Sequence, residues 1–306
     1  MGNLLFRRLF AIPLVLLAVV TVVFVSIRLV PGDPARMMAG METSEETVQA
    51  IRHQLGLDRP LLVQYISFVA DLARGRLGRS IMTSEPVSLE ILARMTPTIL
   101  LMATSLLLGL VIGLIGGVSS ATRPGSPTDV VASALVYVGI SLPTYWIGLM
   151  AIWLFAVQWR LLPSIGSGSV RHLVLPALTL GIASASTFAK MVRGSMREVM
   201  GLPYVRTARA KGLDERRVIF RHALMNALIP TITLVGLEIG WLLTGAVVVE
   251  TVFSWPGLGR LLIQSIASRD IPVVQGIVLV MTLVFILSNA LVDILYIIVD
   301  PRLQYA

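Results

Sequence analysis

Apolar residues gather in six long stretches of the chain, and each is long enough to cross a lipid bilayer as one helix. Such a helix needs about 20 mainly apolar residues, because every backbone amide must find its partner within the segment. The stretches cover residues 9–30, 98–117, 130–157, 173–192, 228–249 and 273–299. The pattern predicts an all-α, polytopic membrane protein with six transmembrane helices.

The first stretch follows Arg7 and Arg8, as the apolar part of a signal peptide follows its basic residues. It is longer than the roughly 7 to 15 apolar residues of such a segment, and residues 31–34 offer no small-residue cleavage site. We therefore expect residues 1–30 to remain in the protein as an N-terminal anchor helix.

The basic residues predict the orientation of the chain. Segments above about 60 residues cross a membrane regardless of their charge, so the segment 31–97 is left out of the comparison. The remaining loops and termini place 13 Lys and Arg on one side and 4 on the other. The positive-inside rule then predicts that both termini are cytoplasmic and that residues 31–97 lie outside. The five apolar stretches that follow predict a five-helix core over residues 98–306.

Two further patterns concern local structure. Thr43 and Glu46 have the spacing of a capping box, Gly56 is placed to end the helix that they open, and apolar residues recur at helical spacing after Pro60. The outer segment is therefore predicted to be a small helical cap.

Small residues that let helices approach closely recur at every fourth position in two stretches, at Gly109, Gly113 and Gly117 and at Ala177, Gly181, Ala185 and Ala189.

Composition narrows the class of protein. A mean hydropathy of +0.84 with 56% apolar residues excludes a water-soluble domain, and the lack of cysteine excludes disulfide scaffolds, Cys-ligated metals and thiol catalysis. No GxxxxGK[ST] phosphate loop is present, and the three histidines lie apart without metal-ligand spacing. We predict that the chain is not an enzyme and that it has no catalytic residue, no metal site and no cofactor of its own.

The cytoplasmic segment 193–227 has the most explicit local pattern. A short helix is predicted before Gly212, which is placed to stop it, and Asp214 is placed to cap a second helix that begins at Glu215. Arg217 and Arg221 form a basic pair on that second helix. From the residues alone, two interpretations stay open: the hairpin lies on anionic lipid headgroups, or it docks a partner protein.

This segment, Tyr204-Val-Arg-Thr-Ala-Arg-Ala-Lys-Gly212 followed by His222-Ala-Leu and Asn226-Ala-Leu-Ile-Pro230, resembles permease subunits of bacterial binding-protein-dependent ABC importers. The similarity narrows to the dipeptide, oligopeptide, glutathione and nickel group, and it extends over most of the chain. Further matching segments are Pro31–Ala35, Leu55–Leu61, Val248–Glu250, Trp255–Arg260, Arg269–Asp270, Val292–Asp293 and Asp300–Arg302. Arg206 and Thr207 depart from the Glu-Ala-Ala of the wider superfamily, as they do in the peptide-type branch.

The resemblance implies the ABC-importer permease fold and a multi-pass place in the bacterial cytoplasmic (inner) membrane. It also implies a second permease subunit, two ATPase subunits that hold ATP and Mg, and an extracytoplasmic substrate-binding protein. No nucleic-acid partner is expected, because the excess basic charge lies on the cytoplasmic side as the topology requires. In that family the segment forms a coupling helix in a cleft of the ATPase. Carried over to this sequence, Arg206, Ala208, Lys211 and Gly212 are the expected coupling residues.

Ionisable residues inside a span are costly and mark candidate functional positions. Glu238 lies between Gly236 and Gly240, while Asn289 and Asp293 share one face of the last stretch. All three are candidates for the substrate pathway, and for each a structural hydrogen bond remains the alternative. The leading hypothesis is a small-peptide importer. The alternatives are a nickel or other small-solute permease, an ion-coupled secondary transporter that uses Glu238 and Asp293, and a membrane scaffold.

Overall fold

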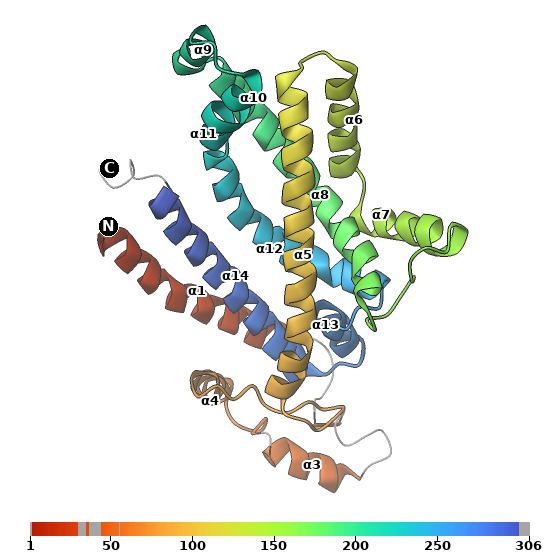
Figure 1. The fold of residues 1–306 in the computed structure, drawn as a ribbon. Helices are drawn as coiled ribbons and strands as arrows, with labels where there is room; N and C mark the ends of the chain where they lie inside the picture. Colours follow the sequence, from red (N-terminus) through yellow and green to blue (C-terminus); the bar gives the residue numbers. More distant parts are fainter. Residues whose placement is uncertain (1, 30–34, 37–43, 55, 300–306) are drawn as a thin grey trace. The chain divides into compact units, whose positions relative to one another are not determined.

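The computed structural model describes residues 2–29, 35–36, 44–54 and 56–299 (Figure 1). Within these ranges every regular element is a helix, which confirms the all-α prediction for this part of the chain. The chain separates into two compact units, one made of Met1–Thr96 with Leu261–Ile286 and the other of Pro97–Arg260 with Leu287–Ala306. The three-part division at residues 30 and 97 stays a prediction.

The second unit is built around one central helix, α8. The long helices that contribute to this unit are α5 (Val87–Thr122), α6 (Pro127–Ser141), α7 (Thr144–Ala151), α8 (Val170–Met200), α12 (Ile229–Val252) and the last part of α14 (Ile271–Val299). Helix α8 packs against α6, α7 and α12, and most of its apolar stretch is buried. It therefore connects the packing of this unit to the segment that follows Met200.

The predicted small-residue seam is where α5 meets α8. A Cβ atom added to Gly113 would lie 2.5 Å from Cβ of Phe188, and one added to Gly109 would lie 2.8 Å from Cβ of Ser184. Such distances leave no room for a side chain, so the two backbones approach closely as the spacing predicts. The same holds at Gly117, where Val192 is the neighbour.

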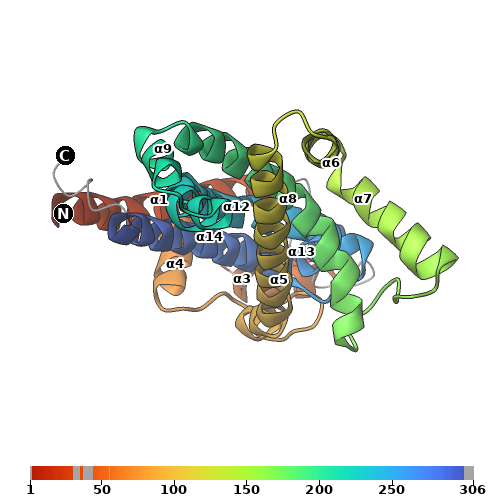
Figure 2. The ribbon, with the colours of Figure 1, turned by 45° about the horizontal axis from the view of Figure 1, so that its top comes forward.

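The third apolar stretch is not one straight helix, which corrects the prediction for residues 130–157. Helix α6 ends at Ser141, and α7 continues into a π-helix, η1 (Ile152–Gln158), at 110° to α6. Leu142 has extended backbone angles, which the ring of Pro143 favours because it disfavours the helical conformation for the residue before it. Figure 2 shows α6 nearly end-on and α7 from the side.

Four helices of the described part are long and apolar enough to cross a membrane, or five when the bent α6–α7 pair counts as one span. They are α5, α8, α12 and residues Ile271–Ala290 of α14. The first helix, α1 (Gly2–Leu29), contributes a shorter apolar segment, Pro13–Ser26. The count of six and the orientation of the termini remain predictions.

The first unit holds the predicted cap helices, α3 (Glu45–Gln54) and α4 (Leu61–Ala73). Gly56 follows α3 with a φ of 65°, as the predicted stop requires, whereas Thr43 lies outside the described residues. Helix α4 packs on α1 through Phe24, whose ring centroid is 5.2 Å from that of Tyr65 and 5.7 Å from that of Phe68.

In the same unit, Asp270 precedes α14 and holds the loop after Gly78. Its carboxylate accepts hydrogen bonds from the hydroxyl of Ser80 at 2.5 Å and from the backbone N–H groups of Ile81 and Met82 at 3.1 and 3.2 Å. Asp270 is 3% exposed. The loop that leads into α5 is therefore fixed to the start of α14 by a single buried side chain.

Candidate functional site

The segment between α8 and α12 forms a compact hairpin of short helices. Helix α9 (Pro203–Ala210) begins with proline at its first turn, where the missing N–H costs nothing. Gly212 then turns the chain at a φ of 75°, with its N–H donating to the carbonyl of Arg209 at 2.9 Å. Because this is the left-handed region, the prediction that Gly212 stops the helix is confirmed.

The second arm of the hairpin begins as predicted at Glu215. The carboxylate of Asp214 accepts a hydrogen bond from the N–H of Arg216 at 3.2 Å, so Asp214 is the N-cap. The arm continues as a π-helix, η2 (Val218–Leu224), and then as α11 (Met225–Ala227). The π-helix was not predicted, since an apolar pattern does not distinguish it from an α-helix over two turns.

An ion pair joins the two arms across the glycine turn. The guanidinium of Arg209 donates to the carboxylate of Glu215 at 2.7 Å. This hydrogen bond lowers the pKa of Glu215 below its usual value and raises that of Arg209 above its own. Both side chains keep substantial contact with solvent, so the pair adds little to stability and acts mainly on the angle between the arms.

Of the four predicted coupling residues, Arg206, Lys211 and Gly212 are exposed on the hairpin. Ala208 is 6% exposed and packs with Val205 and Val218 inside the hairpin. The small side chain of Ala208 therefore allows the two arms to approach, while the basic side chains of Arg206 and Lys211 remain exposed.

The hairpin is anchored to the long helices by an apolar cluster. Ala223 and Ala227 of the second arm are buried against Val192 and Met196 of α8 and Ala121 of α5. Asn226, also on the second arm, joins the two arms of the hairpin, since its amide donates to the hydroxyl of Tyr204 at 3.0 Å. The second arm of the hairpin thus packs directly on the ends of α5 and α8.

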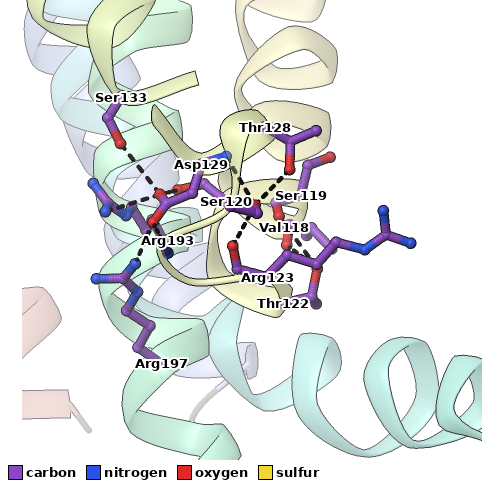
Figure 3. A network of polar contacts seen from close by, with 12 residues as sticks. Val118, Ser119, Ser120, Thr122, Arg123, Thr128, Asp129, Ser133, Arg193 and Arg197 are labelled. Atoms are coloured by element: carbon purple, nitrogen blue, oxygen red, sulfur yellow. Dashed lines mark hydrogen bonds and ion pairs between the residues drawn. The ribbon is translucent and has the colours of Figure 1, made fainter. Parts of the chain in front are cut away.

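Beside this anchor, a buried aspartate connects three helices (Figure 3). Asp129, in the first turn of α6, is paired with Arg193 at 2.9 Å and Arg197 at 3.0 Å, one turn apart on α8. It also accepts hydrogen bonds from the hydroxyl of Ser120 on α5 and from the N–H of Gly125. We call Asp129, Arg193 and Arg197 the arginine clamp.

The arginine clamp was not predicted from the sequence. One local signal was available, since Ser126 and Asp129 have helix-capping spacing and the hydroxyl of Ser126 accepts from the N–H of Asp129. Arg193 and Arg197 lie at i and i+4, which puts both on one face of α8. The pairing itself joins residues 64 and 68 positions apart, so no local pattern predicts it.

A second buried carboxylate lies near Pro97, where the part of α5 that belongs to the second unit begins. Glu250, at the end of α12, is 0% exposed, and its oxygens accept from the hydroxyl of Thr98 at 2.6 Å and from the N–H of Arg260 at 3.0 Å. The Thr98 hydroxyl in turn accepts from the N–H of Leu258 at 2.8 Å. We call Glu250 and Thr98 the glutamate cap, because they satisfy the first N–H groups of α13 (Leu258–Ala267).

Tight packing surrounds the glutamate cap. A Cβ atom added to Gly257 would lie 2.1 Å from a carboxylate oxygen of Glu250, so only glycine fits at this position. The indole N–H of Trp255 donates to the carbonyl of Pro97 at 3.0 Å. Glu250, Trp255 and Gly257 lie in segments that resemble the importer family, but the contacts that they make were not predicted from the sequence.

The candidate pathway residues lie on α12 and α14. Glu238 is 6% exposed, and Gly236, which lies about 200° from it around the helix, is buried too. Asn289 is half-buried, whereas the side chain of Asp293 lies outside the described part of the structure. Among the described residues no hydrogen bond or ion pair joins Glu238 to Asn289, and no group of three His, Asp or Glu side chains is placed to hold a metal ion. The role of all three pathway residues stays a prediction.

Comparisons with known proteins add the family relationship. Residues 109–305 match the model of the "Binding-protein-dependent transport system inner membrane component" family, and residues 1–102 match the model of its N-terminal part. The chain is 42% identical over its whole length, and the whole of the relative, to the glutathione transport system permease protein GsiC of Salmonella choleraesuis (strain SC-B67). It is 40% identical, with the same full coverage, to GsiC of Escherichia coli (strain K12).

Solved structures show the same fold at low sequence identity. The MetNI methionine ABC transporter in an inward-facing conformation matches with a TM-score of 0.62 at 22% identity, over 71% of this chain and 100% of the other. An amino acid ABC transporter with histidines matches with a TM-score of 0.55 at 17% identity, over 68% and 94%. About seven tenths of the chain therefore share the fold of these transporter subunits.

Proposed function

Because the chain belongs to the family of inner membrane components of binding-protein-dependent transport systems, we propose that it is one permease subunit of an ATP-driven importer for small peptides of the glutathione type. The observation that carries this proposal is the 42% identity over the full length to a glutathione transport permease. The proposed partners are a second permease subunit, two ATPase subunits that bind ATP and Mg, and an extracytoplasmic substrate-binding protein. The chain itself would hold no cofactor.

We place the chain in the bacterial cytoplasmic membrane with six spans and both termini in the cytoplasm. In this topology α1 and the bent α6–α7 pair add two spans to the four long apolar helices. The basic coupling hairpin then faces the cytoplasm, where the ATPase subunits lie. The distribution of Lys and Arg supports this orientation.

The hairpin geometry supports a route for the coupling of ATP hydrolysis to transport. Exposed Arg206 and Lys211 lie on the arm that would enter the ATPase, and Gly212 sets the angle to the second arm. That arm packs on α8 and α5, so closure of the ATPase pair would displace both helices. The arginine clamp would carry the same displacement to α6.

The pathway for the cargo is proposed to pass Glu238, Asn289 and Asp293. Support comes from the position of Glu238 in the middle of α12, where a carboxylate needs a polar partner. The chain itself places the hydroxyl of Ser184 beside this carboxylate, and a cationic group, such as the amino terminus of a peptide, would supply the opposite charge. Glu238→Gln is expected to weaken peptide uptake, and an unchanged transport affinity in that variant would remove the role in substrate contact.

Reconstitution into liposomes tests the function. We expect uptake of labelled glutathione only when the permease pair, both ATPase subunits, the binding protein and ATP are all present. Omission of the ATPase subunits serves as the matched control. Uptake driven by an ion gradient alone would identify a secondary transporter, and uptake of nickel but not of peptides would reassign the cargo.

A further inference from the structure

Helix α4 of the cap has one face that packs on the protein and another apolar face that nothing in its unit covers. Tyr65 and Phe68 meet Phe24 of α1, and the hydroxyls of Tyr65 and Thr21 are 2.7 Å apart. About 100° further round the helix, Leu62 and Ile66 are 69% and 58% exposed. An exposed apolar face of this kind marks a site of interaction.

The polar residues of α4 other than Tyr65 are confined to a narrow third stripe, Gln64, Ser67 and Asp71, of which Gln64 and Asp71 are already engaged. Gln64 donates from its amide to the carbonyls of Leu57 and Arg59, at 3.1 and 2.8 Å. Asp71, the one charged residue in the sequence of α4, is paired with Arg76 at 2.6 Å. The helix therefore presents two apolar faces and a single narrow polar stripe, so the apolar face that does not pack on α1 is free for contact with lipid.

The place where α4 meets α1 indicates what covers the free face. Thr21 and Phe24 lie eight and five residues before the end of α1 at Leu29, which is about 7 to 12 Å along the helix axis. Neighbouring residues of α1 are apolar and exposed, among them Val22 at 63%. In a span, these residues contact the hydrocarbon, and α4 lies beside them at the same level.

We infer that α4 is an interfacial helix that lies in the outer leaflet of the bilayer beside α1, with Leu62 and Ile66 against lipid acyl chains. Its depth agrees with the roughly 5 to 10 Å at which such helices are buried below the headgroups. The inference rests on the proposed topology, in which α1 crosses the membrane. The surface of α4 thus continues the lipid-facing surface of α1.

The other cap helix provides an internal contrast. Helix α3 carries Glu45, Glu46, Arg52 and His53 within ten residues, and Gln49 is exposed on it. A helix with this composition belongs in water. The cap would therefore have one helix in the membrane surface and one in the aqueous space, rather than forming a wholly aqueous domain.

The lack of native cysteine permits a direct test with single spin labels in the complete chain. Labels are attached to L62C and I66C, to Q49C on α3 as the aqueous control, and to V22C on α1 as the lipid control. The chain is reconstituted in phosphatidylethanolamine and phosphatidylglycerol vesicles, and the accessibility of each label to oxygen and to a water-soluble nickel chelate is measured.

We expect the labels at positions 62 and 66 to prefer oxygen over the nickel chelate by several fold, as at position 22, and the label at position 49 to show the reverse. Strong accessibility of positions 62 and 66 to nickel, with position 22 still in lipid, would overturn the inference and leave the topology intact. Low accessibility of 62 and 66 to both reagents would assign the face to a protein partner instead. Exposure of position 22 to nickel would contradict the topology and, with it, the inference.

Discussion

Two buried carboxylates, Asp129 and Glu250, hold the two ends of the membrane core of α5 by different means. Asp129 meets Ser120 near the end of α5 and is paired with two arginines. Glu250 meets Thr98, 22 residues earlier, and receives a hydroxyl and a backbone N–H but no cation. At about 1.5 Å per residue the two attachments are some 33 Å apart, close to the thickness of a bilayer core.

The two carboxylates make attachments of different rigidity at the two ends of α5. A glutamate bound by backbone N–H groups fixes one geometry, because those donors cannot move without unfolding α13. Arginine side chains are long and keep their charge in several positions, so the arginine clamp can stay closed while α8 shifts against α6. We therefore expect mutations in the glutamate cap to lower stability and mutations in the arginine clamp to lower coupling.

The largest loss of stability is expected for Glu250→Ala. The substitution leaves the N–H of Arg260 and the hydroxyl of Thr98 buried without an acceptor, which costs about 3 kcal/mol. The measurement is thermal unfolding of the purified protein in detergent. Glu85→Ala, at an exposed position, is the control, and equal unfolding temperatures for the two variants would refute the cap.

Glycine substitutions extend the comparison to the backbone at each end. Gly257→Ala would place a methyl group 2.1 Å from Glu250 and is expected to cost about 1 to 3 kcal/mol. Gly125→Ala, near Asp129, meets no atom within 4 Å and carries only the strain of its φ of 74°, about 1 kcal/mol. Thermal unfolding of both variants should rank them in this order, and the opposite order would contradict the packing around Glu250.

Asp129→Asn is expected to change stability little and transport strongly. The side chains of Arg193 and Arg197 are 28% and 42% exposed, so both charges keep contact with solvent when their partner is lost, but α6 loses its ion pairs to α8. Uptake per ATP hydrolysed should fall in proteoliposomes. Arg123→Gln, on the same corner but outside the arginine clamp, should leave this ratio unchanged, and a parallel fall in both variants would remove the specific role of the clamp.

The smallest effect is expected for Glu215→Gln in the coupling hairpin. The pair with Arg209 is exposed, so its loss costs at most about 0.5 kcal/mol. Since the pKa of Glu215 is lowered by Arg209, the contribution of the pair persists above the normal carboxyl pKa and is lost as the pH falls through the lowered value. The difference in unfolding temperature between wild type and variant should vanish at low pH, and a difference that grows there would contradict the pairing.

Local backbone chemistry in this chain could be predicted from the sequence. Gly212 and Asp214 form the turn and the cap that their types favour, and the cap helices begin and end near the expected residues. These features depend on neighbours within four positions. The seam at Gly113 was also predictable, because small-residue spacing has one main structural use within a membrane.

The tertiary contacts could not be predicted in this way. Asp129 finds Arg197 only because α6 and α8 pack side by side, and Glu250 finds Thr98 across 152 positions. The bend at Pro143 was missed because the apolar pattern continues through it without interruption, and hydropathy does not record direction. The pathway residues remain predictions, because the proposed route for the cargo lies between this chain and a second permease subunit.

The most direct test of the central claim compares Gly212→Val with Gly194→Val in proteoliposomes that contain the complete transporter. Gly212 has a left-handed φ of 75° that valine resists, whereas Gly194 lies in α8 with no atom within 4 Å of an added Cβ. Uptake and ATP hydrolysis are measured in the same vesicles. The account predicts that Gly212→Val abolishes substrate-stimulated uptake while the subunit stays inserted, and that Gly194→Val behaves like wild type. Normal uptake and normal substrate-stimulated hydrolysis in Gly212→Val would contradict transmission through the hairpin.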